Sequence, residues 1–268
     1  MADFNLLEWA NVGLGKGNAY KLSISIKKLA ETLPPEVKSL RFFGKVSTKS
    51  SPYYILEGSS PEDEDEADPS EREGRAGVNK YAYWVSHSVS ASPEEWKKLP
   101  HATFAQLLTA QKFKRFLTGR LDAPVSSYPP FPGTEASLLR VIIAQIVGST
   151  SISPDGYFEV DEDADEGTIK AVEPAALLEK GYKTANELKE AEGWRHHELA
   201  INSLGRITPL PEPEEGAEHV EEPVEVSKPL SELKAEDWVI RTFQHEQATV
   251  VARSSVWPGA LAVSSGQK

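Results

Sequence analysis

Hydrophobic residues recur along this chain with two spacings, one typical of helices and one typical of strands. After Asn18, which can serve as an N-cap, apolar side chains come at four-, three- and four-residue steps and so share one helix face: Leu22, Ile26, Leu29 and Leu33. Pro34-Pro35 would end this helix. Three later stretches are dense in aromatic and β-branched residues and predict strands: 40–46, 53–57 and 80–89. We expect these strands to form an antiparallel meander packed on the N-terminal helix.

A second helix is predicted before the centre of the chain. Thr103 and Gln106 form a capping-box pattern. We expect the helix to run from Pro100 to Leu117, with Gly119 in the left-handed conformation that commonly follows a helix end.

The centre itself is rich in proline and then strongly apolar. Because proline fixes φ and makes the residue before it extended, residues 125–131 are predicted to run as a stiff strut of polyproline II type. Thr134 can then cap a helix that ends at Gly148 and has little polar face. A helix of that kind must be buried, and we expect the strut to be buried with it.

The C-terminal half has weaker patterns. Pro154-Asp155-Gly156 predicts a turn before a short extended segment at 157–160, and Thr184 with Glu187 predicts a capped helix through about Ala191. Residues 209–229 are rich in Pro and Glu, as linkers are. Alternation predicts strands at the end of the chain, at 238–243, 249–253 and 260–264.

These elements predict an α+β fold, with the strut and the buried helix at its centre and a looser C-terminal half carrying a small antiparallel β region and acidic loops. We expect three parts: an α+β core at 1–158, an acidic and Pro/Glu-rich linker with short helices at 159–229, and a β-hairpin region at 230–268 that completes the same fold.

The net charge of −12 is concentrated in three runs. Residues 62–73 hold eight acids and one Arg, 159–166 hold six acids, and 212–225 hold seven acids. The rest of the chain has 20 acids and 28 bases, so it carries +8. Solvated loops that keep like-charged surfaces apart are the favoured explanation, and tuning of a partner-facing surface is the alternative.

No catalytic arrangement is assembled in the sequence. The glycines at 13, 15 and 17 fit neither the dinucleotide fingerprint nor the P-loop, and no GxSxG elbow occurs. His196-His197-Glu198 lacks the HExxH spacing, because Ala200 and Ile201 stand where the second His would be needed. The chain has no Cys, so disulfides and thiolate metal sites are excluded. We predict no cofactor and no metal.

The sequence also bears on which classes of partner the chain binds. The one short basic patch, Lys112 to Arg115, is weak evidence for nucleic-acid binding in a chain of pI about 5.1. No apolar run approaches the roughly 20 residues that a membrane span requires. Tyr128 to Pro132 could instead be a ligand for a polyproline-reading domain.

Several runs, taken together, resemble one known family. The longest is FLTGRLDAPVSSYPPFPG, and others follow in the family's order: Val12–Gly15, Leu40–Lys45, Tyr53-Tyr54, Asn79–Tyr81, Tyr83–Val85, Ile152–Pro154, Trp194 with His196-His197, and Trp257–Ala260. They resemble the radial spoke head proteins of motile cilia and flagella, in particular the paired scaffold paralogues. Family members usually carry an N-terminal extension and continue beyond the position of Lys268 into an aromatic strand segment, which leaves open how the C-terminal sheet is closed.

The resemblance implies a non-enzymatic scaffold of the axonemal radial spoke head, needed for regulated beating. It implies as partners other spoke head proteins, including a paralogue or second copy of this chain, and the central pair apparatus, with no nucleic acid and no membrane. An adaptor ligand, or a metal-dependent enzyme using the His-His-Glu cluster, is the alternative. We expect structural or partner-binding roles for these residues: Phe43, Tyr54, Trp84, Tyr128, Phe131, Trp194, His196, His197 and Trp257.

Overall fold

The computed structural model describes residues 2–59, 70–74, 77–160, 169–197, 201–207, 228–233, 235–244 and 248–265. The chain divides into two compact units. Unit 1 comprises Met1–Lys16, Ile146–Ala200 and Pro209–Lys268, and unit 2 comprises Gly17–Gln145 and Ile201–Thr208. The predicted α+β class is confirmed, since both units combine helices with antiparallel sheets. The three-part division of the chain stays a prediction.

Unit 2 is built on the predicted meander. Its four strands are antiparallel and lie in sequence order: β1 (Leu40–Val46), β2 (Tyr53–Ser59), β3 (Tyr81–Ser86) and β4 (Lys97–Lys98). A β-bulge interrupts β1, because Phe42 pairs with Leu56 and Gly44 with Ile55, which leaves Phe43 as the extra residue. The Phe43 ring meets the Tyr83 ring edge-to-face at 5.6 Å.

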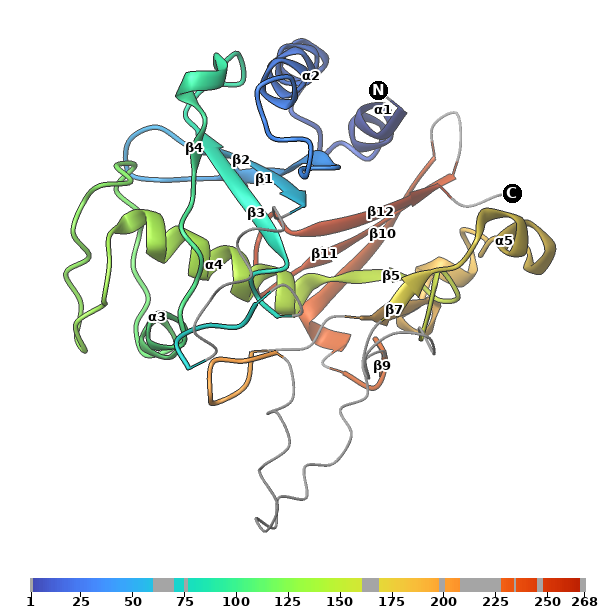
Figure 1. Cartoon of the computed structure of the whole chain (residues 1–268). Helices are drawn as coiled ribbons and strands as arrows, with labels where there is room; N and C mark the ends of the chain where they lie inside the picture. Colours follow the sequence, from blue (N-terminus) through green and yellow to red (C-terminus); the bar gives the residue numbers. More distant parts are fainter. Residues whose placement is uncertain are drawn as a thin grey trace. The chain divides into compact units, whose positions relative to one another are not determined.

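The two central strands are buried along almost their whole length. Tyr53, Ile55 and Glu57 project to one face of β2, and α4 (Glu135–Thr150) contacts that face through Glu135 and Arg140. A second helix, α2 (Lys16–Ala30), is fastened to the segment after β3 by Ser25, whose hydroxyl donates to the Ala91 carbonyl. Figure 1 shows α2 above the β1–β3 strands and α4 below them in this view.

The apolar helix predicted after the prolines is confirmed. It begins at Glu135, directly after Thr134, and continues through Gly148 to Thr150. Its side chains are buried on several sides, as a helix with little polar face requires. The buried apolar residues of unit 2 come from this helix, from the sheet and from α2, and they include Leu22, Leu29, Ile55, Leu56, Trp84, Val85, Leu138, Leu139, Val141 and Ile143.

The helix predicted over 100–117 is shorter than expected. It forms α3 (Phe104–Ala110) with the Thr103–Gln106 capping box in place, but it ends at Gln111. Beyond that residue the backbone makes tertiary hydrogen bonds in place of helical ones, because the Leu117 carbonyl accepts from Lys49 N at 2.9 Å. Gly119 is left-handed, with φ of +93°, yet it caps no helix.

Unit 1 contains the strands of the C-terminal half. The predicted strands at the chain end are confirmed as the antiparallel sheet β10 (Trp238–Gln244), β11 (Ala248–Ser254) and β12 (Leu261–Ser265). A second sheet has the order β5 (Ile152–Pro154), β8 (Trp194–His196) and β9 (Lys228–Pro229), and β6 (Phe158–Val160) pairs with β7 (Ile169–Ala171). The described part of this unit also includes the helices α1 (Ala2–Trp9), which contacts β12, and α5 (Pro174–Lys180).

The core of unit 1 gathers around Trp194, which has no exposed surface. Its indole N–H donates to the Leu188 carbonyl at 2.9 Å, so the polar end of this large side chain is satisfied inside the core. The apolar neighbours come from both sheets and from the turns between them: Ile152, Leu188, Leu230, Val250 and Ala252.

The helix predicted from Thr184 to about Ala191 is wrong in type. The capping-box contacts between Thr184 and Glu187 form, but they lead into two short 3-10 turns, η3 (Glu187–Lys189) and η4 (Ala191–Gly193). The chain folds back at Gly193, where a Cβ would come within 2.3 Å of the Glu187 carbonyl oxygen. The chain therefore turns back so that Trp194 packs against Leu188, and a regular helix does not form here. Of the predicted Pro- and Glu-rich stretch at 209–229, residues 209–227 lie outside the described residues, and Lys228–Pro229 form β9.

Candidate functional site

The proline-rich segment forms a closed loop, which we call the connector loop (residues 118–134). Pro124 and Thr134 are bridged in antiparallel fashion, and the N–H groups of Glu135 and Ala136 each donate at 2.9 Å to the carbonyls of Ala123 and Leu121. Residues 121–124 therefore lie beside the start of α4, and the chain loops away from there and returns at Thr134. The predicted extended strut is wrong in this respect, because tertiary pairing of the loop ends bends the chain back.

The carboxylate of Glu135 closes this loop. Its Oε2 accepts from the N–H and the hydroxyl of Thr118, at 2.7 and 2.8 Å. Its Oε1 accepts from the Tyr53 hydroxyl and the Gly119 N–H, both at 2.8 Å, and from the Arg120 N–H at 3.2 Å. Glu135 also stands in the first turn of α4, where a negative charge complements the helix dipole. One side chain thus fixes β2, the loop and the helix to each other.

The electrostatics of this pair follow from burial and hydrogen bonding. Burial of Glu135 opposes its ionisation, but the hydrogen bonds from Thr118, Tyr53 and Gly119 outweigh that cost and lower the pKa of Glu135. Burial and the hydrogen bond to Glu135 both raise the pKa of Tyr53. At neutral pH the charged carboxylate and the neutral phenol are therefore the stable forms.

Gly119 is required at its position for two reasons. Its φ of +93° is in the left-handed region, which favours glycine. A Cβ there would also come within 2.1 Å of the Ser50 Oγ in the turn between β1 and β2. The Ser50 hydroxyl meanwhile donates to the Thr118 carbonyl at 2.8 Å, so this turn lies directly against the loop.

The connector loop is anchored at its ends and exposed along its middle. Phe131 is buried and its ring meets Phe113 edge-to-face at 6.1 Å, whereas the Tyr128 side chain is 92% exposed. A cis peptide bond joins Tyr128 to Pro129. The prediction of a buried strut is thus wrong for most of the segment, because exposed positions alternate with less exposed ones between residues 124 and 130.

A second polar network lies between α4 and the sheet. Arg140, only 2% exposed, places its guanidinium over the Tyr83 ring at 4.7 Å, and the Tyr83 hydroxyl donates to Glu57 at 3.0 Å. Glu57 also pairs with Arg41 at the rim of the sheet. The Arg140 NH2 donates to the Val78 carbonyl. Burial lowers the pKa of Arg140, and the negative charge of Glu57 opposes that effect.

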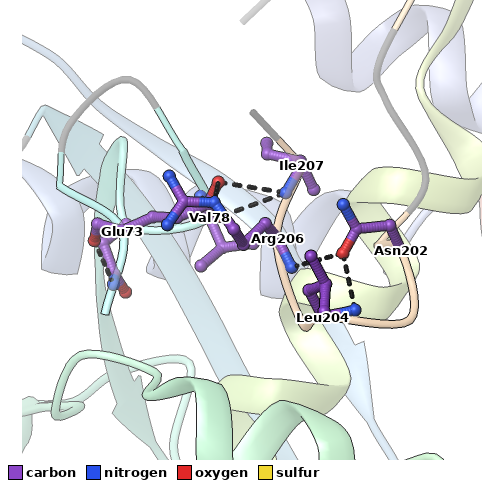
Figure 2. A network of polar contacts seen from close by, with 7 residues as sticks. Glu73, Val78, Asn202, Leu204, Arg206 and Ile207 are labelled. Atoms are coloured by element: carbon purple, nitrogen blue, oxygen red, sulfur yellow. Dashed lines mark hydrogen bonds and ion pairs between the residues drawn. The ribbon is translucent and has the colours of Figure 1, made fainter. Parts of the chain in front are cut away.

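Glu73 forms a third network, which holds a segment from far along the chain (Figure 2). Both of its carboxylate oxygens accept from the Ile207 N–H, at 3.0 and 3.1 Å, although the two residues are 134 positions apart. Arg206 lies over the Phe104 ring at 5.2 Å, so the segment 201–207 also contacts α3. The side chain of Asn202 shapes this segment by accepting from Leu204 N and Arg206 N.

The aromatic residues that the sequence singled out fall into two sets. In unit 2, Phe43, Trp84 and Phe131 are core or half-buried residues, Tyr54 lies beneath the Lys45 ammonium at 5.8 Å, and only Tyr128 is fully exposed. Unit 1 holds the rest: Trp194 in its core, His196, His197 and Trp257. Their roles in partner binding stay predictions.

The adjacent histidines have different surroundings. His196 lies in β8, between Ile152 and Lys228 of the neighbouring strands, while the His197 ring stacks on Phe158 at 4.6 Å. Among the described residues, no group of three or more His, Cys, Asp or Glu side chains is arranged to hold a metal. No described helix has both the length and the apolar character needed to cross a membrane.

Sequence reasoning missed Tyr53, Glu73, Glu135 and Arg140, which organise the three networks. One signal was present: Glu135 and Arg140 are the only charged residues of the helix Glu135–Thr150, and apolar residues flank Arg140 on both sides. A charge in a helix that must be buried requires a partner inside the protein. The partners themselves come from strands and loops at least 15 positions away, which no local pattern reveals.

The buried polar side chains of unit 2 therefore hold its loops, strands and helices together. The fold and these networks are those of an α+β protein whose described polar networks have a structural role. The chain belongs to the radial spokehead-like protein family, whose family model matches residues 1–75 and 66–268. Proteins of this family are components of axonemal radial spokes in cilia and flagella.

Individual relatives match over nearly the whole chain. It is 31% identical to radial spoke head protein 4 homolog A of Homo sapiens, over 97% of this chain and 44% of that protein. It is 30% identical to radial spoke head protein 6 homolog A of Mus musculus, over 97% and 46%. It is 31% identical to flagellar radial spoke protein 4 of Chlamydomonas reinhardtii, over 98% and 63%. The chain thus spans less than half the length of the two mammalian relatives.

Proposed function

We propose that this chain is a non-enzymatic structural subunit of the axonemal radial spoke. The observation that carries this proposal is the family match along the entire chain. The three networks of unit 2 support it, because a scaffold must hold its surface in one geometry while partners bind. Glu135, Arg140 and Glu73 are committed to backbone and side-chain partners of the same unit, and each is an unsuitable acid or base for catalysis in that setting.

The partners in this proposal are other spoke head subunits and either a second copy of this chain or a paralogue of it. The assembled head faces the central pair apparatus and passes mechanical contact from it toward the motors of the outer doublets. Exposed aromatic side chains such as Phe116 and Tyr128 support a binding role, since aromatic residues are enriched where proteins pack together.

Localisation tests the proposal directly. A tagged chain, expressed in a motile ciliated cell that lacks its own copy, is expected to fractionate with the axoneme and to restore beating. In a spokeless background the same chain should be lost from the axoneme. A chain that stays diffuse in the cell body of a spoke-competent strain would overturn the proposal.

The enzymatic alternative has its own test. Natively purified protein is analysed for bound metals and nucleotides by elemental analysis and by release of bound small molecules. A stoichiometric metal that is lost on replacing both His196 and His197 by Gln would favour the enzyme over the scaffold. We expect no stoichiometric ligand.

A further inference from the structure

Two large apolar side chains stand out on the surface of unit 2. Tyr128 is 92% exposed and Phe116 is 79% exposed, more than any other large hydrophobic residue in the described part of the chain. Fully exposed aromatic rings bring no stability to the isolated chain, because their apolar area stays in water. Where such rings gather in one region, they are typical of a surface that binds another molecule.

The segments that carry these rings lie side by side. The Arg115 NH1 donates to the Ser126 carbonyl at 2.7 Å, which ties the residue before Phe116 to the loop two residues before Tyr128. The Phe113 and Phe131 rings, from the same two segments, also pack edge-to-face at 6.1 Å. We call this region the connector surface and define it by six residues: Lys112, Lys114, Arg115, Phe116, Arg120 and Tyr128.

The backbone on both sides is fixed. After Phe116, the Leu117 carbonyl accepts from Lys49 N and the Thr118 N–H donates to Glu135. Before Tyr128, the Ser127 hydroxyl donates to the Pro129 carbonyl at 2.9 Å. Rings on such a backbone lose less conformational entropy on binding than rings on a loose loop, which favours affinity.

The connector surface is also basic. Residues 111–134 contain four basic side chains and a single acidic one, Asp122, in a chain whose net charge is −12. Lys112, Lys114 and Arg120 are exposed. A positively charged surface is complementary to a negatively charged segment. The aromatic rings require in addition that this segment has backbone or apolar atoms that can cover them.

We propose that the connector surface binds an acidic, extended segment of a partner polypeptide. The basic side chains face its carboxylates, and Phe116 and Tyr128 pack against its backbone. A nucleic acid fits less well, because its dense phosphate charge is repelled by the net charge of the whole chain, whereas a short acidic segment is repelled less. A second copy of this chain would supply the same chemistry, since residues 62–68 hold six acids. The inference rests on the proposed structural role and specifies the chemistry of the partner.

The test uses the full chain and a synthetic peptide with the sequence of residues 60–70. Binding is measured by fluorescence anisotropy of the labelled peptide in 50 and 300 mM NaCl. The surface variants are Lys112→Gln with Lys114→Gln, and separately Tyr128→Ser. The matched controls change exposed residues of α2 in the same unit: Lys27→Gln with Lys28→Gln, and Tyr20→Ser. Circular dichroism checks that each variant folds.

We expect saturable binding that weakens at least about 5-fold in each surface variant and less than about 2-fold in the controls. Salt should weaken it by about 10-fold, because exposed charges are screened. A peptide with the acids replaced by amides should not bind. Absence of binding, equal binding by all variants, or tighter binding of polyuridylate than of the peptide would each overturn the proposal. None of these results depends on axonemal localisation, so a failure here leaves the proposed function standing, and a chain that fails to localise can still bind the peptide.

Discussion

The Tyr53 hydroxyl donates a 2.8 Å hydrogen bond to Glu135 across 82 positions of the sequence, and both residues are buried. Tyr53 begins β2 and Glu135 begins α4, so this one contact fixes the start of the central helix to the start of a central strand. The backbone of the connector loop donates to the same carboxylate. The longest of the runs that resemble the family, FLTGRLDAPVSSYPPFPG, thus has a structural explanation, in which Thr118, Gly119 and Glu135 close a loop against the sheet.

Replacing Glu135 by Gln should destabilise the fold by about 3 kcal/mol, because one accepting oxygen and the charge are lost while buried N–H donors remain. Tyr53→Phe removes a single donor and should cost about 1 kcal/mol. Urea unfolding of both single variants and the double variant gives the coupling between them. If the double variant lost as much free energy of unfolding as the two single variants added together, the contact would be contradicted, because the effects of residues in contact are not additive.

The Glu135 contribution should depend on pH in one direction. Its pKa is lowered in the folded state, so the contribution is complete above the unfolded value of about 4.3 and is lost as pH falls through the lower, folded value. The stability gap between the wild type and Glu135→Gln should therefore be constant from about pH 7 to 5 and shrink below about pH 4. Urea unfolding at each pH measures the gap. A gap that widens in acid would contradict the assignment.

Elements with a repeating local pattern were predicted well from the sequence, and tertiary contacts were not. The meander, the central helix and the C-terminal strands each follow from alternation or helical spacing that extends over several residues. The predicted end of α3 and the predicted helix near Leu188 were wrong because contacts outside the local pattern decide both. The Leu117 carbonyl accepts from Lys49 N, and the Leu188 carbonyl accepts from the Trp194 indole. The connector loop was predicted to be buried because it leads directly into an apolar helix. Its ends are instead fixed by Glu135, a contact between distant residues that no local pattern reveals, and its middle is exposed at Tyr128.

Arg140 should be more costly to lose than its direct hydrogen bonds to the Val78 carbonyl and to Asn79 Oδ1 imply. Arg140→Met leaves the Val78 carbonyl and the charge of Glu57 without this neighbour inside the unit, and we expect a loss of about 3 kcal/mol. Arg140→Lys keeps the charge but lacks the flat group that lies over Tyr83, and should lose about half as much. Lys27→Met on exposed α2 is the control, expected within about 0.5 kcal/mol. Equal stability of Arg140→Met and wild type would show that the network contributes nothing.

The acidic run at 62–66 should not contribute to the stability of the fold. Neutralising its five acids to Gln or Asn should shift the thermal midpoint by less than about 2 °C, as expected for solvated surface charges. The change raises the net charge of the chain from −12 to −7. A large fall in the thermal midpoint, measured by differential scanning calorimetry, would mean that the run packs against basic parts of the folded units.

The Glu73 carboxylate should decide whether segment 201–207 stays on unit 2. In Glu73→Gln only one oxygen remains to accept from Ile207 N and Val78 N, so the amide of Ile207 should exchange with solvent at least about 10-fold faster. Gly77→Ala should act in the same way without touching the segment, because a Cβ at Gly77 comes within 2.4 Å of the Glu73 Cβ and displaces that side chain. Glu71→Gln makes the same chemical change on an exposed side chain two positions away and should leave the exchange rate unchanged. Hydrogen exchange with fragment-resolved mass spectrometry measures all three variants. Unchanged protection in both Glu73→Gln and Gly77→Ala would mean that the contact of Arg206 with Phe104 holds the segment by itself.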